Sequence, residues 1–235
     1  MKITAKHLPA GKITVEEKEE MYAILHKYFG NISPEKFADD LLSKDRVIIM
    51  KDENTGQVVG FSTQKIFETQ FLEEDVIVVY SGDTIVDEQY WRSIQLPRTF
   101  WDMIQSISRN NPGKRIFWML ISKGVRTYRF LPVFYNSFYP SYQHPIPEDI
   151  QLFMHKIGKY IFPERYDPGS GIIKSFGKHQ FLKLQYHPRK DRNKDLHERF
   201  FYEKNPKFYE GDELLCLVET KLSNLKPYFQ ELFSQ

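Results

Sequence analysis

The sequence predicts an α/β protein: a mixed, mostly antiparallel twisted sheet flanked by helices, followed by a C-terminal α+β extension. Segments with apolar residues at helical spacing and short β-branched runs follow one another through residues 15–142. Short turns join the first three predicted strands, which makes them antiparallel neighbours. A helix joins the third strand to the fourth, which makes that pair parallel. The chain has 235 residues, 41% of them apolar and 15% aromatic, which is enough for a sizeable core.

Two helices are predicted before the first strand. Residues 15–29 carry apolar groups at helical spacing, and Gly30 ends that pattern. Ser33 is a favourable N-cap residue, and Pro34 suits the first turn of a second helix. Phe37 lies on the apolar face of this second helix.

Four apolar runs predict strands, and an amphipathic helix separates the last two of them. The strands are residues 46–51, 57–67, 76–86 and 115–121, and the helix is residues 97–108. An aromatic segment at residues 128–138 is predicted to be a helix interrupted at Pro132.

The last third of the chain is less regular. It contains predicted helices at residues 147–161 and 222–233 and predicted strands at residues 181–186 and 213–220. We therefore expect a core of residues 1–142 and an extension of residues 143–235 that packs with it as one unit.

Composition limits the compartment and the partners. The net charge of +2 is too small to indicate a nucleic-acid partner. One cysteine, Cys216, excludes an internal disulfide and favours a reducing compartment. The N-terminus has no apolar signal core, and no run approaches the roughly 20 apolar residues of a membrane span. We expect a soluble cytoplasmic protein.

The basic stretch, the histidines and the cysteine have structural interpretations. Residues 178–199 hold seven Lys or Arg against three Asp or Glu, and a solvated mixed-charge face is preferred over an anion or nucleic-acid patch. The seven histidines show no paired spacing, and there is no Cys-x-x-Cys, so no metal site is expected. Cys216 lies in an apolar run and is interpreted as a packing residue.

Residues 76–103 read as a buried strand, a polar loop and a helix. Such a junction leaves unpaired main-chain N–H groups at the helix N-terminus, and these can hold phosphate. The loop has no glycine after Gly82, which weighs against a close approach of phosphate to the backbone.

Three segments carry a resemblance to a known family. They are Asp-Thr-Ile-Val-Asp-Glu-Gln-Tyr-Trp-Arg at residues 83–92, Gln-Val-Val-Gly-Phe-Ser at residues 57–62 and the aromatic segment 128–142. By element order and strand pattern over residues 15–142, the chain resembles the GNAT acyltransferase superfamily. It also resembles bacterial GNAT-like proteins with a C-terminal extension.

The resemblance implies acetyl-CoA or a longer acyl-CoA as donor and a small-molecule or peptide amine as acceptor, with no metal. It implies that the acyl carbonyl and the pantetheine pair with backbone near Ile85 and Val86. The pyrophosphate would lie on the loop amides and the helix N-terminus, at Trp91, Arg92, Ser93, Ile94, Gln95 and Leu96. The identity of the acceptor, the acyl chain length and the oligomeric state are not indicated.

The loop departs from the family pattern. Family members carry Arg or Gln and two small residues where this chain has Trp91, Ile94 and Leu96. Pro97 disfavours helical geometry at Leu96, so the helix is expected to begin at Pro97. Either the loop binds phosphate in an altered geometry or the CoA site has been lost. The alternatives to an acyl-CoA enzyme are a non-catalytic binding module and a transferase that uses an acyl-carrier-protein donor.

Four residues are candidates for proton transfer. Asp83 and Tyr80 lie on the third predicted strand and are candidate bases; alternation places them on opposite faces. The alternative for Asp83 is a carboxylate bonded to backbone or to an arginine such as Arg126. By the resemblance, Tyr135 or Tyr139 would protonate the leaving sulfur, against the alternative of aromatic packing.

Three further polar residues have plain structural explanations. Ser122 and Lys123 follow the fourth strand, where cleft residues often lie, but a cap or turn explains them equally well. Glu68 could reach an acceptor, but an exposed strand end accounts for it.

Overall fold

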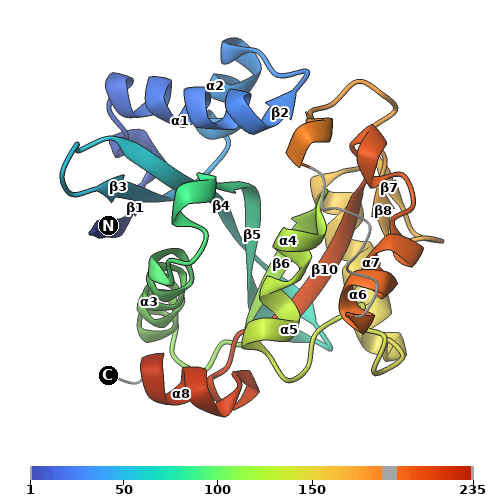
Figure 1. Cartoon of the computed structure of the whole chain (residues 1–235). Coiled ribbons are helices and arrows are strands. Elements are labelled where there is room, and N and C mark those ends of the chain that lie inside the picture. Colours follow the sequence, from blue (N-terminus) through green and yellow to red (C-terminus); the bar gives the residue numbers. More distant parts are fainter. Residues whose placement is uncertain (1, 187–194, 234–235) are drawn as a thin grey trace. The chain divides into compact units, whose positions relative to one another are not determined.

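The computed structural model describes residues 2–186 and 195–233 (Figure 1). The chain forms two compact units. The first comprises Met1–Tyr28, Ile32–Thr69 and Asp75–Ile116, and the second comprises Phe29–Asn31, Gln70–Glu74 and Phe117–Gln235. The expected division at residue 142 remains a prediction.

The first unit contains four strands in the spatial order β1-β3-β4-β5. The strands are β1 (Ile3–Pro9), β3 (Arg46–Asp52), β4 (Val58–Phe71) and β5 (Glu74–Val86). Its α-helices are α1 (Val15–Tyr28), α2 (Pro34–Leu42) and α3 (Gln95–Asn110). The predicted helices and strands of this region are confirmed, and the hydroxyl of Ser33 accepts a bond from Lys36 N as the expected cap of α2.

Strand β1 was not predicted. It pairs antiparallel with β3 along its whole length, from Ile3 opposite Asp52 to Pro9 opposite Arg46. It is the outer strand in the order, and its exposed positions carry polar groups such as Lys6, as is usual for an edge strand. Such a strand lacks the continuous apolar run from which the other strands were predicted.

The strands run mostly antiparallel: β3 pairs in the opposite direction with both β1 and β4. Ile77 N, near the start of β5, donates to Arg115 O at 3.0 Å, immediately before β6 (Ile116–Ser122). The predicted fold class, a mixed and mostly antiparallel arrangement flanked by helices, is confirmed.

The second unit contains β6 and the strands of the C-terminal region, in the order β6-β10-β8-β7, and a separate pair β2-β9. These strands are β7 (Tyr166–Asp167), β8 (Ile172–Ile173), β10 (Glu213–Glu219), β2 (Phe29–Gly30) and β9 (Phe181–Leu182). Its α-helices are α4 (Val125–Tyr128), α5 (Phe130–Phe134), α6 (Glu148–Ile161), α7 (Leu196–Lys204) and α8 (Pro227–Phe233). Three aromatic rings, those of Phe71, Phe117 and Phe153, pack with centroids 4.9 to 5.3 Å apart.

The prediction of one aromatic helix over residues 128–138 is wrong. Two short helices replace it, and Pro132 lies inside α5, where the first turn needs no N–H from it. Beyond Phe134 the chain bends and forms isolated bridges to distant segments, at Tyr135 to Leu225 and at Tyr139 to Leu217.

Two other C-terminal elements are shorter than predicted. The strand of residues 181–186 is reduced to β9, followed by a 3-10 turn at Leu184–Tyr186. The final helix begins at Pro227, because Leu225 is extended with φ −68° and ψ 151°. Residues 187–194, which hold much of the basic stretch 178–199, lie outside the described residues.

Candidate functional site

The C-terminal half of β5 contains a bulge. A Cβ on Gly82 would lie 2.8 Å from Thr63 Oγ1, whereas Thr84 Oγ1 lies 2.7 Å from Ser62 Oγ. Adjacent residues of β4 point to opposite faces, so Gly82 and Thr84 also lie on opposite faces although they are two positions apart.

The register beyond the bulge agrees with this reading. Asp87 N donates to Val59 O at 2.9 Å, which is the pairing expected once β5 has gained one residue. The extra residue falls at Asp83, and bulges of this kind re-aim side chains near functional sites. Simple alternation therefore does not fix the side of the strand to which Asp83 points, and its role as a base remains a prediction.

A row of polar side chains runs along β4 and crosses to β5 at Thr84, next to the bulge. Gln64 Nε2 donates to Ser62 Oγ at 2.8 Å, and Ser62 Oγ shares the 2.7 Å bond with Thr84. Within the described part of the chain, Gln64 Oε1 and the neighbouring Thr63 Oγ1 are buried and have no hydrogen-bond partner. No sequence pattern indicated this row.

Lys44 lies against β5 at Gly82, on the face opposite to Thr84. The sequence did not indicate it as a site residue. Its side chain is only 3% exposed, and its ammonium bonds Asp40 Oδ1 at 2.5 Å and Ser43 Oγ at 2.9 Å. The ammonium lies 5.9 Å from the ring centroid of Tyr80, which is itself buried.

Three side chains fix the loop between β5 and α3. Lys27 Nζ pairs with Asp87 Oδ2 at 2.6 Å, and this bond raises the pKa of Lys27. Tyr28 OH accepts a bond from Glu88 N at 2.7 Å.

The third contact fixes Tyr90. Its hydroxyl donates to Asp52 Oδ2 at 2.8 Å. This bond, followed by one from Asn54 N, lowers the pKa of Asp52. These three contacts hold the loop between β5 and α3 in place where it leads into the helix.

The main-chain donors at this junction divide into two groups. Ser93 N donates to Tyr90 O at 2.9 Å, and Gln95 N donates to Ser93 Oγ at 3.1 Å. Among the described residues, no acceptor is found for the N–H groups of Arg92, Ile94 and Leu96. These three donors, with the exposed Arg92 side chain, form a cationic end of α3 suited to an anion.

The absence of glycine does not prevent this turn from forming. Ile94 has φ −94° and ψ 5°, and none of the described non-glycine residues with positive φ lies between residues 91 and 96. Helix α3 begins at Gln95, two residues before the predicted start at Pro97. Pro97 falls in the first turn, where its missing N–H costs nothing.

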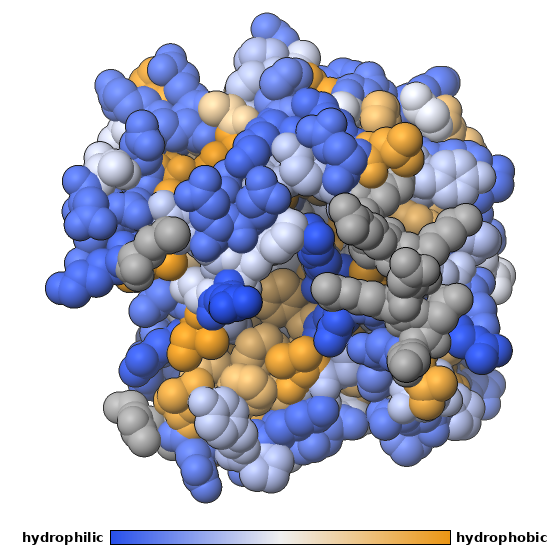
Figure 2. Space-filling view, in the orientation of Figure 1, coloured by the Kyte–Doolittle hydropathy of each residue, from blue (hydrophilic) through white to orange (hydrophobic). Residues whose placement is uncertain are grey.

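Two large side chains stand on the loop surface. Trp91 and Ile94 are each 42% exposed. On the face of the molecule drawn in Figure 2, most side chains are hydrophilic and the apolar ones gather in a few places. Trp91 Nε1 donates to Val86 O at 2.8 Å, so the indole covers one of the backbone groups expected to bind pantetheine.

The first unit thus contains ten of the twelve predicted site residues. Along β5 and the start of α3 lie Tyr80, Asp83, Ile85, Val86, Trp91, Arg92, Ser93, Ile94, Gln95 and Leu96. Their functional assignments remain predictions.

The candidate acids Tyr135 and Tyr139 belong to the second unit and lie at isolated bridges, not on the predicted helix. Tyr135 is buried, its ring packs 6.1 Å from that of Trp118, and burial raises its pKa. Tyr139 exchanges main-chain bonds with Leu217 at 2.9 and 2.7 Å, and it is half-buried.

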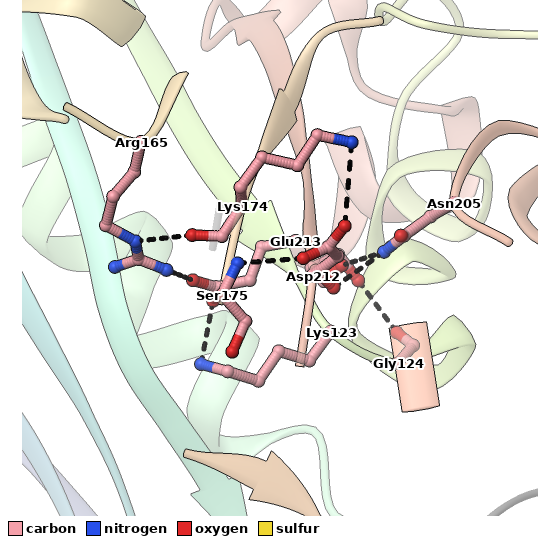
Figure 3. Close-up of polar contacts among 9 residues, drawn as sticks. Lys123, Gly124, Arg165, Lys174, Ser175, Asn205, Asp212 and Glu213 are labelled. Carbon is pink, nitrogen blue, oxygen red and sulfur yellow. Dashed lines mark hydrogen bonds and ion pairs between the residues drawn. The ribbon is translucent and has the colours of Figure 1, made fainter. Parts of the chain in front are cut away.

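A buried ionic cluster occupies the second unit (Figure 3). Glu213 pairs with Lys123 at 2.8 Å and with Arg165 at 3.4 Å. Asp212 accepts a bond from Ser175 N at 2.8 Å and pairs with Lys174 at 3.6 Å. The cluster ties β8 and β10 to the turn after β6.

Ser122, Glu68 and Cys216 each have the structural role that was predicted as the alternative to a functional one. The Ser122 hydroxyl donates to Gly124 O at 2.7 Å, which agrees with the turn interpretation. Glu68 pairs with Lys114 at 2.6 Å on the surface. Cys216 is fully buried, and burial raises its pKa, so the packing interpretation is confirmed.

The described residues contain neither a cluster of metal ligands nor a membrane-spanning helix. Within the described ranges, no three His, Cys, Asp or Glu side chains gather as metal ligands. No helix in these ranges is both long and apolar enough to cross a membrane.

Comparison with known proteins gave matches by structure alone. No protein-family model matches the sequence, and no curated protein matches it. One similar solved structure is a conserved Enterococcus faecalis protein described as a probable N-acyltransferase, with TM-score 0.44 and 12% identity. The match covers 59% of this chain and 33% of that chain, so this chain spans about a third of its length.

Two further similar structures were solved as complexes. The GNAT family N-acetyltransferase YhbS from Escherichia coli, in complex with CoA, has TM-score 0.38 and 20% identity, covering 55% of this chain and 69% of that one. NAA60 from Arabidopsis thaliana, in complex with a bisubstrate analogue, has TM-score 0.40 and 18% identity, covering 57% and 86%. The description of the Escherichia coli structure names the GNAT family, which the sequence resembles.

Proposed function

We propose that the protein transfers an acetyl or longer acyl group from acyl-CoA to an amine. The observation that carries the proposal is the group of three main-chain donors without an acceptor in the described structure, at Arg92, Ile94 and Leu96. They stand at the cationic end of α3, where a pyrophosphate would be stabilised.

The reaction needs few groups from the protein. The amine nitrogen bonds to the thioester carbonyl carbon, and the carbon–sulfur bond breaks to release the CoA thiolate. A base takes the proton from the amine, an acid gives one to the sulfur, and main-chain groups near Ile85 and Val86 stabilise the carbonyl oxygen.

Tyr80 and Asp83 are the two candidate bases, and the two candidate acids can be ranked. The Lys44 ammonium lies 5.9 Å from the ring centroid of Tyr80, and the bulge falls at Asp83. Tyr139 is placed before Tyr135 as the acid, because Tyr135 is buried among core side chains.

One observation favours a non-catalytic module instead. The indole of Trp91 already bonds the Val86 carbonyl, as expected of a loop that no longer receives an acyl donor.

Thermal-shift titration distinguishes the enzyme, the carrier-dependent transferase and the binding module. A ligand that binds the folded state raises the apparent melting temperature once its concentration exceeds the Kd. A response to acetyl-CoA supports the enzyme, a response only to acyl-carrier protein supports a carrier-dependent transferase, and no response to either supports the module.

Calorimetric titration of loop variants tests the donor site directly. Ser93→Pro removes the bond to Tyr90 O and disfavours the conformation of Arg92, so CoA binding should be lost. Ser93→Ala leaves the main chain unchanged and frees Gln95 N, so affinity should be retained. Equal affinity in the two variants would exclude phosphate binding by these amides.

A further inference from the structure

Gly60 on β4 lies directly opposite Val86 on β5. Asp87 N donates to Val59 O at 2.9 Å, so residues 59 and 87 form a hydrogen-bonded pair. In an antiparallel ladder the next pair along, Gly60 with Val86, is not hydrogen-bonded, and the two main chains are closest there. The N–H of Val86 therefore points away from β4, toward the other edge of β5.

A side chain at residue 60 would not fit without a shift of its neighbours. A Cβ there would lie 3.0 Å from Ile85 O, 3.2 Å from Val86 Cα and 3.2 Å from Met50 Sδ. The Met50 thioether ends a flexible side chain and can give way. The other two atoms belong to the main chain of β5, so a methyl group would push Ile85 and Val86 outward by a few tenths of an ångström.

The direction of that shift bears on the acyl donor. Because β4 occupies one edge of β5, a donor that bonds the Val86 N–H must approach from the other edge. N–H···O bonds fall within about 2.7 to 3.2 Å, so a main-chain shift of this size toward that edge is enough to weaken such a bond. A methyl group at residue 60 would thus act on the groups that stabilise the thioester oxygen in the proposed reaction.

We propose that Gly60 is a positioning residue for the acyl donor. Because it has no side chain, β4 approaches Ile85 and Val86 closely enough to fix their backbone where the pantetheine arm and the thioester bind. The inference rests on the proposed function. It gives a role to a residue of the segment 57–62, which carries part of the family resemblance.

The two ends of an acyl-CoA should respond differently to a side chain at residue 60. The loop that leads to the proposed pyrophosphate donors is held by its own contacts to α1 and β3. Gly60→Ala should therefore weaken the binding of acetyl-CoA, whose pantetheine arm reaches β5. It should leave the binding of adenosine 3′,5′-bisphosphate, which lacks that arm, unchanged. Loss of one neutral hydrogen bond corresponds to between about two-fold and ten-fold in affinity.

Calorimetric titration of both ligands provides the test, at a temperature at which circular dichroism shows each variant to be folded. Gly158→Ala is the matched control, because its Cβ would lie 2.9 Å from the Tyr166 ring in the second unit. It should cost stability and change neither affinity. The double variant Gly60→Ala, Met50→Ala removes the Met50 contact and keeps both main-chain contacts, so it should lose acetyl-CoA affinity as Gly60→Ala does.

The outcomes separate the two proposals. Native protein that binds acetyl-CoA, with a Gly60→Ala variant that binds it equally well, overturns the inference and leaves the proposed function standing. An equal loss for both ligands also overturns it, because the substitution would then act through the whole fold. Recovery of acetyl-CoA affinity in the double variant overturns it too, because Met50 would then transmit the change. Native protein that does not bind acetyl-CoA overturns the proposed function and this inference together.

Discussion

Ser62 Oγ and Thr84 Oγ1 lie 2.7 Å apart and join β4 to β5 immediately beyond the bulge at Asp83. Before the bulge, Gly82 lies against Thr63, and after it Thr84 lies against Ser62. The hydroxyl pair therefore fixes the shifted register, and it sets the position of the Ile85–Val86 backbone on which the proposed donor site depends.

Replacement of Thr84 by valine should destabilise the protein by about 1 kcal/mol, because a half-buried hydroxyl bond is lost with little change in shape. Urea unfolding followed by circular dichroism measures the change. Thr4→Val on the exposed face of β1 is the matched control and should have little effect. Equal unfolding midpoints for Thr84→Val and the native protein would show that the register does not depend on this bond.

Gly82→Ala should cost about 1 to 3 kcal/mol, the usual penalty for overpacking. The new Cβ would lie 2.8 Å from both Lys44 Cε and Thr63 Oγ1. Gly11→Ala is the control, because no atom lies within 4 Å of its Cβ position. If the two alanine variants unfold at the same urea concentration, the strand has more room at Gly82 than the structure indicates.

Local signals predicted most of the first unit. The Ser33-Pro34 start, the Gly30 stop and the apolar runs each act over a few residues, so α1, α2 and β3 to β6 could be predicted from the sequence. The edge strand β1 was missed because its polar positions gave no apolar run.

Contacts that depend on register could not be predicted. The aromatic groups around Tyr135 satisfy helical spacing, but bridges to Leu225 and Leu217 hold that chain out of a helix, and both partners lie some 80 to 90 positions away. Lys44 was overlooked for a similar reason, since its approach to Tyr80 exists only once β5 is in place.

The Tyr90–Asp52 bond should make stability depend on pH. The pKa of Asp52 is lowered in the folded state, chiefly by the Tyr90 hydroxyl, so this stabilisation is present above the ordinary Asp value of 3.8 and is lost as pH falls through the lower folded value. The same bond raises the pKa of Tyr90 in the folded state. Its stabilisation is therefore fully present below the ordinary Tyr value of 10.0, and it is lost as pH rises through the higher folded value.

Tyr90→Phe should therefore lower the unfolding midpoint most between these limits. The difference from the native protein should shrink at pH 2 to 3. Urea midpoints over the pH range provide the measurement, with Tyr228→Phe on an exposed ring as the control. A difference that stays constant with pH would mean that Asp52 is not the partner that matters.

Glu213 should be the most sensitive member of the ionic cluster in the second unit. It is 4% exposed and pairs with two cations, Lys123 and Arg165. Glu213→Gln leaves both cations without their carboxylate, and removal of one partner of a buried pair costs about 3 kcal/mol or more. Lys123→Met should cost less, because Arg165 still compensates the carboxylate of Glu213.

The same change at Glu210 is the control for Glu213→Gln. Glu210 pairs with Lys207 on the surface at 3.5 Å, where an ion pair contributes less than about 1 kcal/mol. Urea unfolding of Glu213→Gln, Lys123→Met and Glu210→Gln should rank their costs in that order. A Glu213→Gln variant as stable as Glu210→Gln would mean that water reaches the cluster and screens its charges, and β10 would then be held in place by its apolar neighbours alone.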